Sequence, residues 1–377
     1  MAHFLVLGAG MVGSVMAADL ARDHDVTLAD IREQNLAAAK ARAGARLTTV
    51  REDLSDPAVI ARLAAKADVV CGALASHLGY AALGAVIDAG RPYCDISFMA
   101  EDFSQLSARA RERGVTAVVD CGVAPGMSHI LSAYAAAQLD RCDQIEIYVG
   151  GLPRERTWPY EYKAAFAPAD AIEEYTRPAR LVEHGSVVTR PALSEPELID
   201  FPGIGTLEAF NTDGLRSLTT SLKVPFMKEK TLRYPGHIEL MRVMRETGLF
   251  SKEPISVGGV VVRPLDVTSA LLFPKWTYAP GEEDLTVMRI IARGSRGSKP
   301  ASITYDLLDY YDRATQATSM ARTTAYPCAI VARMLAAGRI DAKGVLPPET
   351  LASEPGLVDH LLTELAARGV RYTRTDT

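Results

Sequence analysis

The sequence predicts an α/β protein in which a doubly wound parallel sheet is followed by a second, α+β domain. Short apolar runs alternate with helical patterns of about ten residues through the first third of the chain, which is typical of parallel strands covered by helices on both faces. After Pro125-Gly126 the pattern changes to strand-like alternation, as in residues 145–149. A length of 377 residues also suits two domains.

The first element is a short apolar strand that ends in a glycine-rich turn. Gly8 allows the tight turn, Gly10 lets the backbone approach a pyrophosphate at the N-terminus of the next helix, and Gly13 lets helix and strand pack closely. The second strand ends at Asp30, near the spacing at which an acid binds a ribose 2′-hydroxyl. This order predicts a dinucleotide-binding (Rossmann) domain that prefers NAD, with NADP less favoured because a carboxylate repels a 2′-phosphate. The residues predicted to contact the dinucleotide are Gly8, Gly10, Met11, Val12, Gly13, Asp30, Asp53, Ala75 and Ser76.

The rest of the first domain continues the alternation of strands and helices. Asp56-Pro57 predicts a helix start, since Asp is a good N-cap and Pro suits the first helical position. Gly90 and Gly114 predict helix ends. Ligands of such sheets bind at the carboxyl ends of the strands, and two of those ends carry Asp95 and Asp120. The predicted strands are residues 4–7, 26–29, 47–50, 68–73, 93–96 and 116–120.

Strand-like runs dominate the middle of the chain, and helical patterns dominate its end. Residues 257–262 and 285–291 are predicted strands, whereas residues 325–337, 349–351 and 355–368 are predicted to be helical. A terminal helical segment of this kind often packs back on the first domain. The predicted domains are residues 1–125 for the dinucleotide, residues 126–317 for the substrate, and residues 318–377 as the returning segment.

Composition excludes several classes of function. The chain is 48% hydrophobic and 23% charged, with a net charge of −5 and dispersed basic residues, which argues against a nucleic-acid surface. No apolar stretch approaches the roughly 18 residues of a membrane span, and no signal peptide is predicted, so we expect a cytoplasmic protein. The five cysteines form no CxxC pair, which predicts reduced thiols and no metal site.

Three motifs together give the chain a family resemblance. Residues 6–13, 120–126 and 231–237 together resemble the saccharopine dehydrogenase-like group, and within it the lysine 6-dehydrogenase branch. The resemblance implies an inserted substrate domain with a mixed sheet, a C-terminal return to the first domain, NAD-linked oxidation of an amine carbon, and a homodimer. Saccharopine reductases tend to carry Asp where this chain has Ala124, and that departure favours the lysine branch.

Amine oxidation needs a hydride acceptor, a general base, and a cation to hold the carboxylate of an amino-acid substrate. Each candidate also has a plain structural alternative: a cap, a core histidine, a solvated lysine, a turn or a surface ion pair. His77 is a further, weaker candidate. The predicted catalytic residues are Asp120, Lys163 and His237, and the predicted substrate-binding residues are His129, Thr212, Asp213, Arg216 and Arg233.

The sequence therefore predicts an NAD-dependent dehydrogenase acting on a small amino acid, most of all on L-lysine at the ε-carbon. The product would be the 6-semialdehyde, which cyclises to a piperideine carboxylate. A saccharopine reductase or a carboxynorspermidine-type dehydrogenase, run as a reductive amination, is the alternative enzyme. A non-catalytic nucleotide-sensing protein on the same scaffold is the alternative from another class.

Overall fold

The computed structural model describes residues 1–166 and 168–377, and the chain forms two compact units. The first unit contains the dinucleotide-type sheet together with most of the C-terminal helices, and the second contains the middle of the chain. The first unit comprises Met1–Tyr134, Asp312–Ala317 and Ala321–Tyr372, and the second comprises Ala135–Tyr311, Thr318–Met320 and Thr373–Thr377.

The first unit is built on a seven-stranded parallel sheet in the order β17-β6-β5-β4-β1-β2-β3. This confirms the predicted doubly wound sheet and adds β17, which comes from the C-terminal segment predicted to be helical. β17 is only three residues long, so no periodicity marks it in the sequence. The strands are β1 (His3–Leu7), β2 (Asp25–Asp30), β3 (Leu47–Arg51), β4 (Val69–Gly72), β5 (Tyr93–Asp95), β6 (Thr116–Val118) and β17 (Gly344–Leu346).

Local signals set the helix ends of this unit. The Ala58 N–H donates to the Asp56 carboxylate at 2.8 Å, as the predicted cap requires. Gly90 has φ = +68°, the left-handed conformation that ends a helix. The helical segment whose end Gly114 predicted consists of a 3₁₀ turn, η1, followed by α5. The helices are α1 (Met11–Leu20), α2 (Glu33–Ala43), α3 (Pro57–Ala64), α4 (Ser76–Asp88), η1 (Phe103–Leu106), α5 (Ser107–Glu112), α6 (Met127–Ala136), α11 (Ser319–Ala336), η2 (Pro348–Ser353) and α12 (Leu357–Ala367), with α6 and α11 extending into the second unit.

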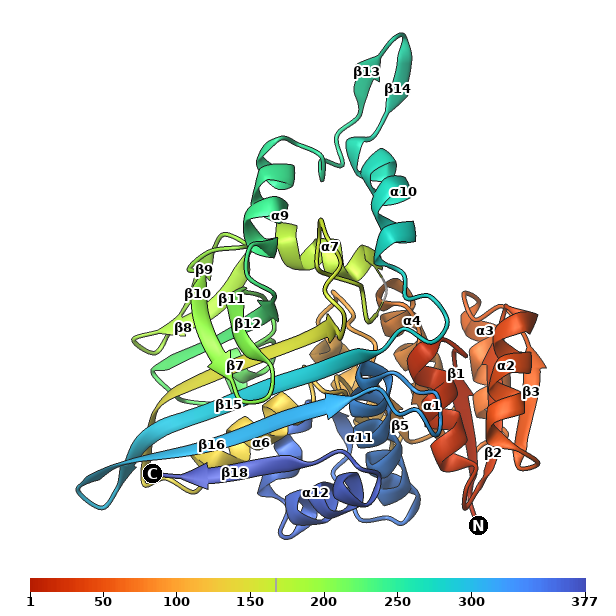
Figure 1. Ribbon diagram of the computed structural model, residues 1–377. Coiled ribbons are helices and arrows are strands. Elements are labelled where there is room, and N and C mark those ends of the chain that lie inside the picture. Colours follow the sequence, from red (N-terminus) through yellow and green to blue (C-terminus); the bar gives the residue numbers. More distant parts are fainter. Residues whose placement is uncertain (167) are drawn as a thin grey trace. The chain divides into compact units, whose positions relative to one another are not determined.

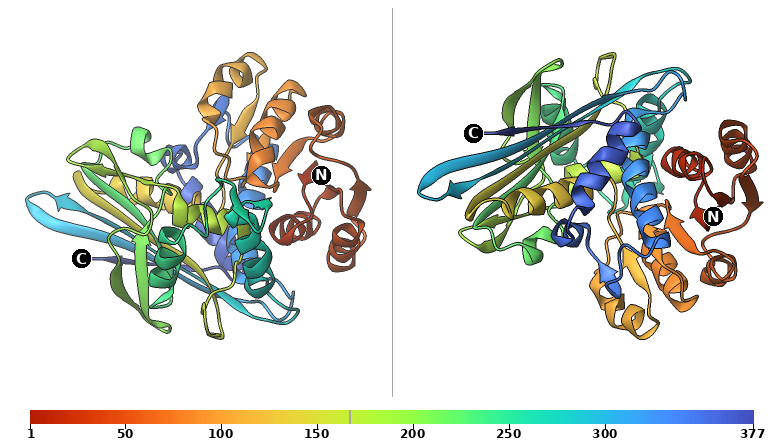
Figure 2. Two further views of the ribbon diagram at one scale, coloured as in Figure 1. Left: turned by 90° about the horizontal axis from the view of Figure 1, so that it is seen from above. Right: turned by 90° about the horizontal axis from the view of Figure 1, so that it is seen from below.

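The second unit is built on a nine-stranded mixed sheet, as the resemblance implied. β12 runs parallel to β7, whereas β15 runs antiparallel to β7 and to β16. These long strands lie side by side in Figure 2. The strands are β7 (Arg141–Pro153), β8 (Ala179–Glu183), β9 (Ser186–Arg190), β10 (Glu197–Phe201), β11 (Gly205–Asn211), β12 (Phe226–Arg233), β15 (Asp284–Arg296), β16 (Lys299–Tyr310) and β18 (Tyr372–Asp376).

Helices α7 (Pro168–Thr176), α9 (His237–Glu246) and α10 (Pro264–Trp276) pack together in this unit, whose short helix is α8 (Leu218–Ser221). Between them lies an aromatic core that includes Tyr162, Tyr175, Phe210 and Trp276. The core therefore sits beside the end of β12, where the predicted substrate residues also occur.

A small hairpin replaces the single strand predicted at 257–262. β13 (Ile255–Val257) and β14 (Val260–Val262) pair antiparallel around Gly258-Gly259, whose φ angles are +56° and +84°. Two successive positive φ angles make a tight hairpin turn, which the apolar pattern does not reveal. Figure 1 shows this hairpin extending beyond α9 and α10.

Candidate active site

The glycine turn after β1 has the geometry that a pyrophosphate needs. Gly8 has φ = +97°, and a Cβ added at Gly13 would lie 1.9 Å from the Gly8 carbonyl oxygen. A Cβ added at Gly10 would meet no heavy atom within 4 Å, so the space above that backbone is open. The first turn of α1 has neither a side-chain cap nor an acidic residue. Its free N–H groups and partial positive charge therefore fit a dinucleotide phosphate.

Asp30, at the end of β2, is held against this turn. Its carboxylate accepts hydrogen bonds from the backbone N–H groups of Ala9 and Arg32, each at 2.7 Å. Arg51 pairs with Asp30 in the register of β2 and β3, and its Nε donates to the Ile31 carbonyl at 3.1 Å. Asp30 therefore has Arg51 opposite it in the strand register and Arg32 two residues after it in the chain, at the position predicted to recognise a ribose. Arg51 was missed from the sequence, and only the strand register brings it there.

The remaining predicted dinucleotide residues lie along the same edge of the sheet. Met11 is 43% exposed in the first turn of α1, next to Val12. Ala75 is the N-cap residue of α4, and Ser76 begins that helix. Asp53, after β3, accepts from the Ser55 N–H and hydroxyl at 2.9 and 2.7 Å, which lowers the pKa of its carboxyl. Their contacts with a dinucleotide stay predictions.

Two buried acids lie at the carboxyl ends of β5 and β6: Asp95 is the last residue of β5, and Asp120 follows β6 by two residues. Asp120 is buried with φ = +54°. The Asp95 carboxylate accepts from the Ser97 hydroxyl at 2.8 Å, and burial raises its pKa to about 8. His129, in the first turn of α6, is fully buried, with its Nδ1 3.0 Å from the Ser128 hydroxyl, whereas His77 is exposed on α4. A buried acid whose pKa lies near neutrality is a candidate for proton chemistry.

In the second unit, alternate residues of β12 place three polar side chains on one face. We call Glu229, Thr231 and Arg233 the β12 row. All three are buried. The Thr231 hydroxyl lies 3.0 Å from that of Thr212. Lys228 and Lys230, which alternate with this row along β12, point the other way, as their ion pairs with Glu146 on β7 and Glu197 on β10 show.

Arg233 is the buried cation of this row. Its Nε donates to the Tyr175 hydroxyl at 3.2 Å, its Nη1 donates to the Leu232 carbonyl at 2.9 Å, and its Nη2 pairs with Glu174. The guanidinium also lies 4.5 Å from the ring centre of Tyr162, a cation–π contact. Its side chain is only 2% exposed. A rigid, permanently charged fork is therefore held in place by groups from three segments.

His237 is linked to Arg233 by hydrogen bonds through the Tyr175 hydroxyl. Its Nδ1 lies 2.9 Å from the Tyr160 carbonyl, which can only accept, so Nδ1 carries the proton. Its Nε2 therefore accepts from the Tyr175 hydroxyl at 3.0 Å. Burial, and then the charge of Arg233, lower its pKa to about 3. The proton-transfer role predicted for His237 assumed an imidazole that titrates near neutral pH, and the structure shows a neutral ring with both nitrogens occupied.

The other predicted residues of this unit have partners of their own. Lys163 forms an ion pair with Glu282. Asp213 accepts two bonds from the Arg180 guanidinium, at 2.7 and 2.9 Å. Arg216 is half-buried in the same turn, with φ = +43°. The β12 row, Thr212, Asp213 and His237 thus come together in one unit, and their roles toward substrate stay predictions.

Glu229 was not predicted from the sequence. It is 4% exposed, and its Oε2 has no hydrogen-bond partner among the described residues. Burial, with the charges of Glu174 and Asp213, raises its pKa to about 8. The available signal was its position two residues before Thr231 and four before Arg233, which puts it on the same face of a strand.

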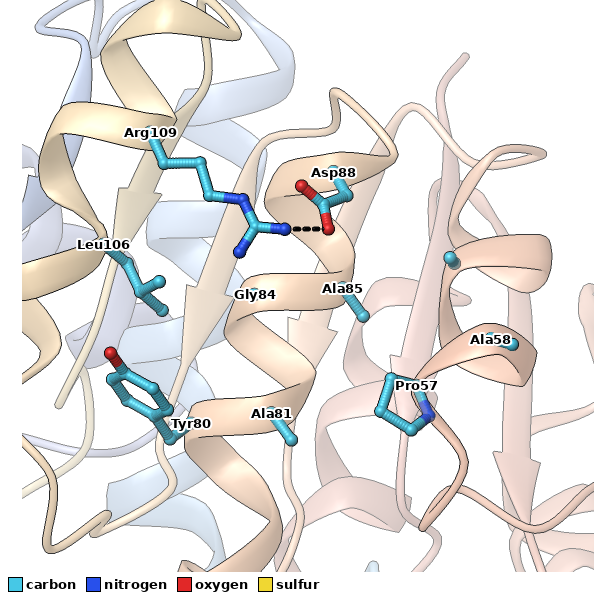
Figure 3. Close-up of a pocket in the computed structure, with 10 residues that line it drawn as sticks. Pro57, Ala58, Tyr80, Ala81, Gly84, Ala85, Asp88, Leu106 and Arg109 are labelled. Atoms are coloured by element: carbon cyan, nitrogen blue, oxygen red, sulfur yellow. Dashed lines mark hydrogen bonds and ion pairs between the residues drawn. The ribbon is translucent and has the colours of Figure 1, made fainter.

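A separate hollow of about 400 Å³ lies on the outer helices of the first unit (Figure 3). Tyr80, Gly84 and Asp88 of α4 line it, and Arg109 of α5 pairs with Asp88 at its rim. It contains none of the predicted site residues. Among residues 1–166 and 168–377, no cluster of His, Cys, Asp and Glu is arranged to hold a metal ion. In those same residues no helix is long and apolar enough to cross a bilayer.

Comparison with known proteins identifies the family of the chain. Residues 4–118 match the saccharopine dehydrogenase NADP binding domain, and residues 122–370 match the saccharopine dehydrogenase C-terminal domain. The chain is 26% identical to carboxynorspermidine synthase of Vibrio cholerae, over 94% of this chain and 93% of the relative. It is 21% identical to saccharopine dehydrogenase (NADP⁺, L-glutamate-forming) of Schizosaccharomyces pombe, over 98% of each.

Among solved structures, apo saccharopine dehydrogenase (L-Glu forming) from Saccharomyces cerevisiae matches with a TM-score of 0.82, at 18% identity and 100% coverage of both chains. That likeness supports the fold. The two family models together span nearly the whole sequence. The chain therefore belongs to the saccharopine dehydrogenase family, and it is an NAD(P)-dependent oxidoreductase that acts on CH–NH2 groups.

Proposed function

We propose that this enzyme oxidises L-lysine at the ε-carbon, with NAD as the acceptor. The observation that carries the proposal is Arg233, a buried guanidinium held by Glu174, Tyr175 and a backbone carbonyl. Such a fork binds a carboxylate with two parallel hydrogen bonds. The substrate would then be an amino acid anchored by its α-carboxylate, so that its distal end is presented for oxidation.

The substrate, the nicotinamide and water together account for all atoms and electrons of the proposed reaction. The bound nicotinamide would accept a hydride from the ε-carbon. The ε-ammonium loses a proton, and the resulting imine adds water and releases ammonium, leaving the semialdehyde. Asp120 and Lys163 are proposed for proton transfer, and His129, Thr212, Asp213 and Arg216 for substrate contacts. For His237 we propose a positioning role, because its neutral ring orients Tyr175 and, through it, Arg233.

The test is turnover with labelled substrate. Wild-type enzyme should form NADH with L-lysine, and lysine labelled with heavy nitrogen only at the ε-amine should release labelled ammonia. Unlabelled ammonia would mean oxidation at the α-carbon. An enzyme that binds dinucleotide but turns over no amine would instead be the nucleotide-sensing alternative.

The preference for NAD rests on Asp30 and is opposed by Arg32 and Arg51, which lie beside it. The matching family model is an NADP binding domain, so the family itself accommodates the 2′-phosphate. Asp30→Ser should move the ratio of kcat/KM for NAD over NADP toward NADP by about tenfold, the effect of one lost hydrogen bond of about 1.4 kcal/mol. An unchanged ratio would remove Asp30 from ribose recognition.

Reductive amination is the second candidate, and the near-complete match to carboxynorspermidine synthase of Vibrio cholerae favours it. It would use the same anchoring of a carboxylate by Arg233 while running in the opposite direction. Consumption of NADPH with an amino-acid semialdehyde and a diamine, in an enzyme inert toward lysine, would select this function.

We also propose a homodimer working in the cytoplasm. The hairpin side chains Ile255, Val257, Val260 and Val261 are between 49% and 71% exposed, an apolar surface that a second subunit would cover. All five cysteines are free, as a reducing compartment maintains them. Analytical ultracentrifugation of the wild type and of Val260→Lys tests the dimer, because a charge on this surface should shift the mass toward the monomer.

A further inference from the structure

The Glu229 carboxyl is buried but only partly satisfied. A Cβ built at Gly214 would lie 1.7 Å from Oε1 and 2.2 Å from Oε2 of Glu229, so the carboxyl packs directly on that glycine. Oε2 nevertheless finds no hydrogen-bond partner in the described part of the chain. Leaving a buried carboxyl oxygen unpaired is costly, so the site favours a ligand that donates to it.

The groups facing Glu229 come from α7 and from the turn after β11. They are Glu174, Asp213 and Arg216. Glu174 is paired with Arg233, and Asp213 is paired with Arg180. Because both of these carboxylates have arginine partners, the carboxyl oxygen of this cluster that lacks a partner among the described residues is Oε2 of Glu229. An additional cation at Glu229 would be attracted by this arrangement.

Glu229 and Arg233 also bear a fixed relation to each other. They lie four residues apart on one face of β12, so their Cα atoms are about 13 Å apart along the strand. Both side chains are long and buried on that face, with Thr231 between them. A substrate with a carboxylate at one end and an amine at the other would match the two charges in order.

We propose that Glu229 binds the distal ammonium of the substrate, and so selects amino acids that carry a second amine. The inference rests on the proposed function, in which Arg233 holds the α-carboxylate. It gives the β12 row a direction, with the carboxylate end at Arg233, Thr231 in the middle and the cationic end at Glu229.

The charge state of Glu229 predicts a release of protons when the substrate binds. Since its pKa is about 8, the carboxyl is protonated at pH 7 in the free enzyme. An arriving ammonium favours the carboxylate, so the carboxyl proton leaves for solvent as the ion pair forms. Binding of lysine at pH 7 should therefore release about one proton, whereas a ligand without the second amine should release none.

The experiment is a calorimetric titration of the NADH-loaded enzyme at pH 7, in two buffers with different ionisation enthalpies. L-Lysine and L-norleucine are the probes, because norleucine lacks only the ε-amine. Wild-type enzyme should bind lysine at least about tenfold more tightly than norleucine. Glu229→Gln should abolish the proton release and the discrimination while leaving the norleucine affinity unchanged.

The matched control is Glu146→Gln. Glu146 is a buried acid on the adjacent strand β7, but it faces the other side of the sheet, where Lys228 and Arg293 pair with it. The Glu146→Gln enzyme should bind lysine and release protons to the same extent as the wild type. Glu229→Asp, which keeps the charge but shortens the side chain, provides a second folded variant and should give intermediate discrimination.

The proposal would be overturned by lysine binding to the wild type without proton release, or by proton release that persists in Glu229→Gln. Failure of wild-type lysine binding would overturn it as well. The proposed function fails by a different measurement, namely absence of NADH formation from lysine. Tight, proton-releasing binding of lysine without turnover would support Glu229 as the ammonium site while refuting lysine oxidation.

Discussion

The candidate sites of the two units are built from different parts of the chain. The candidate site of the first unit consists of backbone: glycines that leave open space or pack closely, and N–H groups at the start of α1. The candidate site of the second unit consists of side chains brought together from α7, β12 and α9, such as Tyr175, Arg233 and His237. A backbone site is encoded by a short local motif, whereas a side-chain site depends on tertiary contacts.

Arg233→Ala gives the largest expected effect on the side-chain site. It leaves Glu174 without its cation and Tyr175 without a donor. Breaking such a pair should lower the unfolding free energy by about 3 kcal/mol, the lower end of the buried range, because the Glu174 side chain is still 26% exposed. In enzyme that remains folded, KM for lysine should rise by about tenfold or more while NAD affinity is unchanged. A parallel loss of NAD affinity would contradict the separation of the two sites.

Two glycine variants separate packing from binding on the backbone site. Gly13→Ala forces a Cβ against the Gly8 carbonyl and should lower stability by about 1–3 kcal/mol, measured by thermal or urea unfolding. Gly10→Ala meets no protein atom, so stability should hold while dinucleotide affinity falls by about tenfold or more. Normal NAD binding in Gly10→Ala would show that the pyrophosphate does not approach this backbone.

A pH titration of stability compares one buried acid from each unit. Asp95 and Glu229 both have a folded-state pKa of about 8, well above their ordinary values, chiefly because of burial. Each therefore contributes stability that is fully present below its ordinary pKa and is lost as the pH rises through about 8. Asp95→Asn and Glu229→Gln should each remove about 1.4 kcal/mol per pH unit from the slope of unfolding free energy between pH 5 and 8. A wild-type stability that is flat over this range would contradict both raised values.

His237→Asn gives the smallest expected effect, and it tests positioning against proton transfer. The ring is already neutral across the working pH range, since its pKa is lowered to about 3. The variant should therefore keep both limbs of the pH–rate profile, and lose about tenfold in kcat/KM through a less well oriented Arg233. Disappearance of the limb near neutral pH would instead support the predicted proton-transfer role.

The first unit was readable from the sequence because its signals are local. The Gly8, Gly10 and Gly13 turn, the Asp56 cap and the alternating strands each depend on neighbouring residues. β17 was not predicted because a strand of three residues shows no periodicity. The hairpin at 255–262 was not predicted because two glycines interrupt an apolar run. In the second unit, motifs led to Arg233 and His237, but not to their charge states. The charge state of His237 is set by burial and by the charge of Arg233, and that of Arg233 by Tyr175 and Glu174, which lie about 60 residues away in the chain.

The hydrogen bonds from Arg233 to Tyr160 run in one direction only. Arg233 donates to Tyr175, Tyr175 donates to His237, and the imidazole donates to a main-chain carbonyl. The carbonyl oxygen of Tyr160 cannot take up a proton and pass it to another group at physiological pH. The series of hydrogen bonds therefore ends at Tyr160 without a proton acceptor. We therefore expect a proton taken from the substrate amine to leave by another route. On this expectation the series of bonds fixes the orientation of Arg233 and does not relay protons.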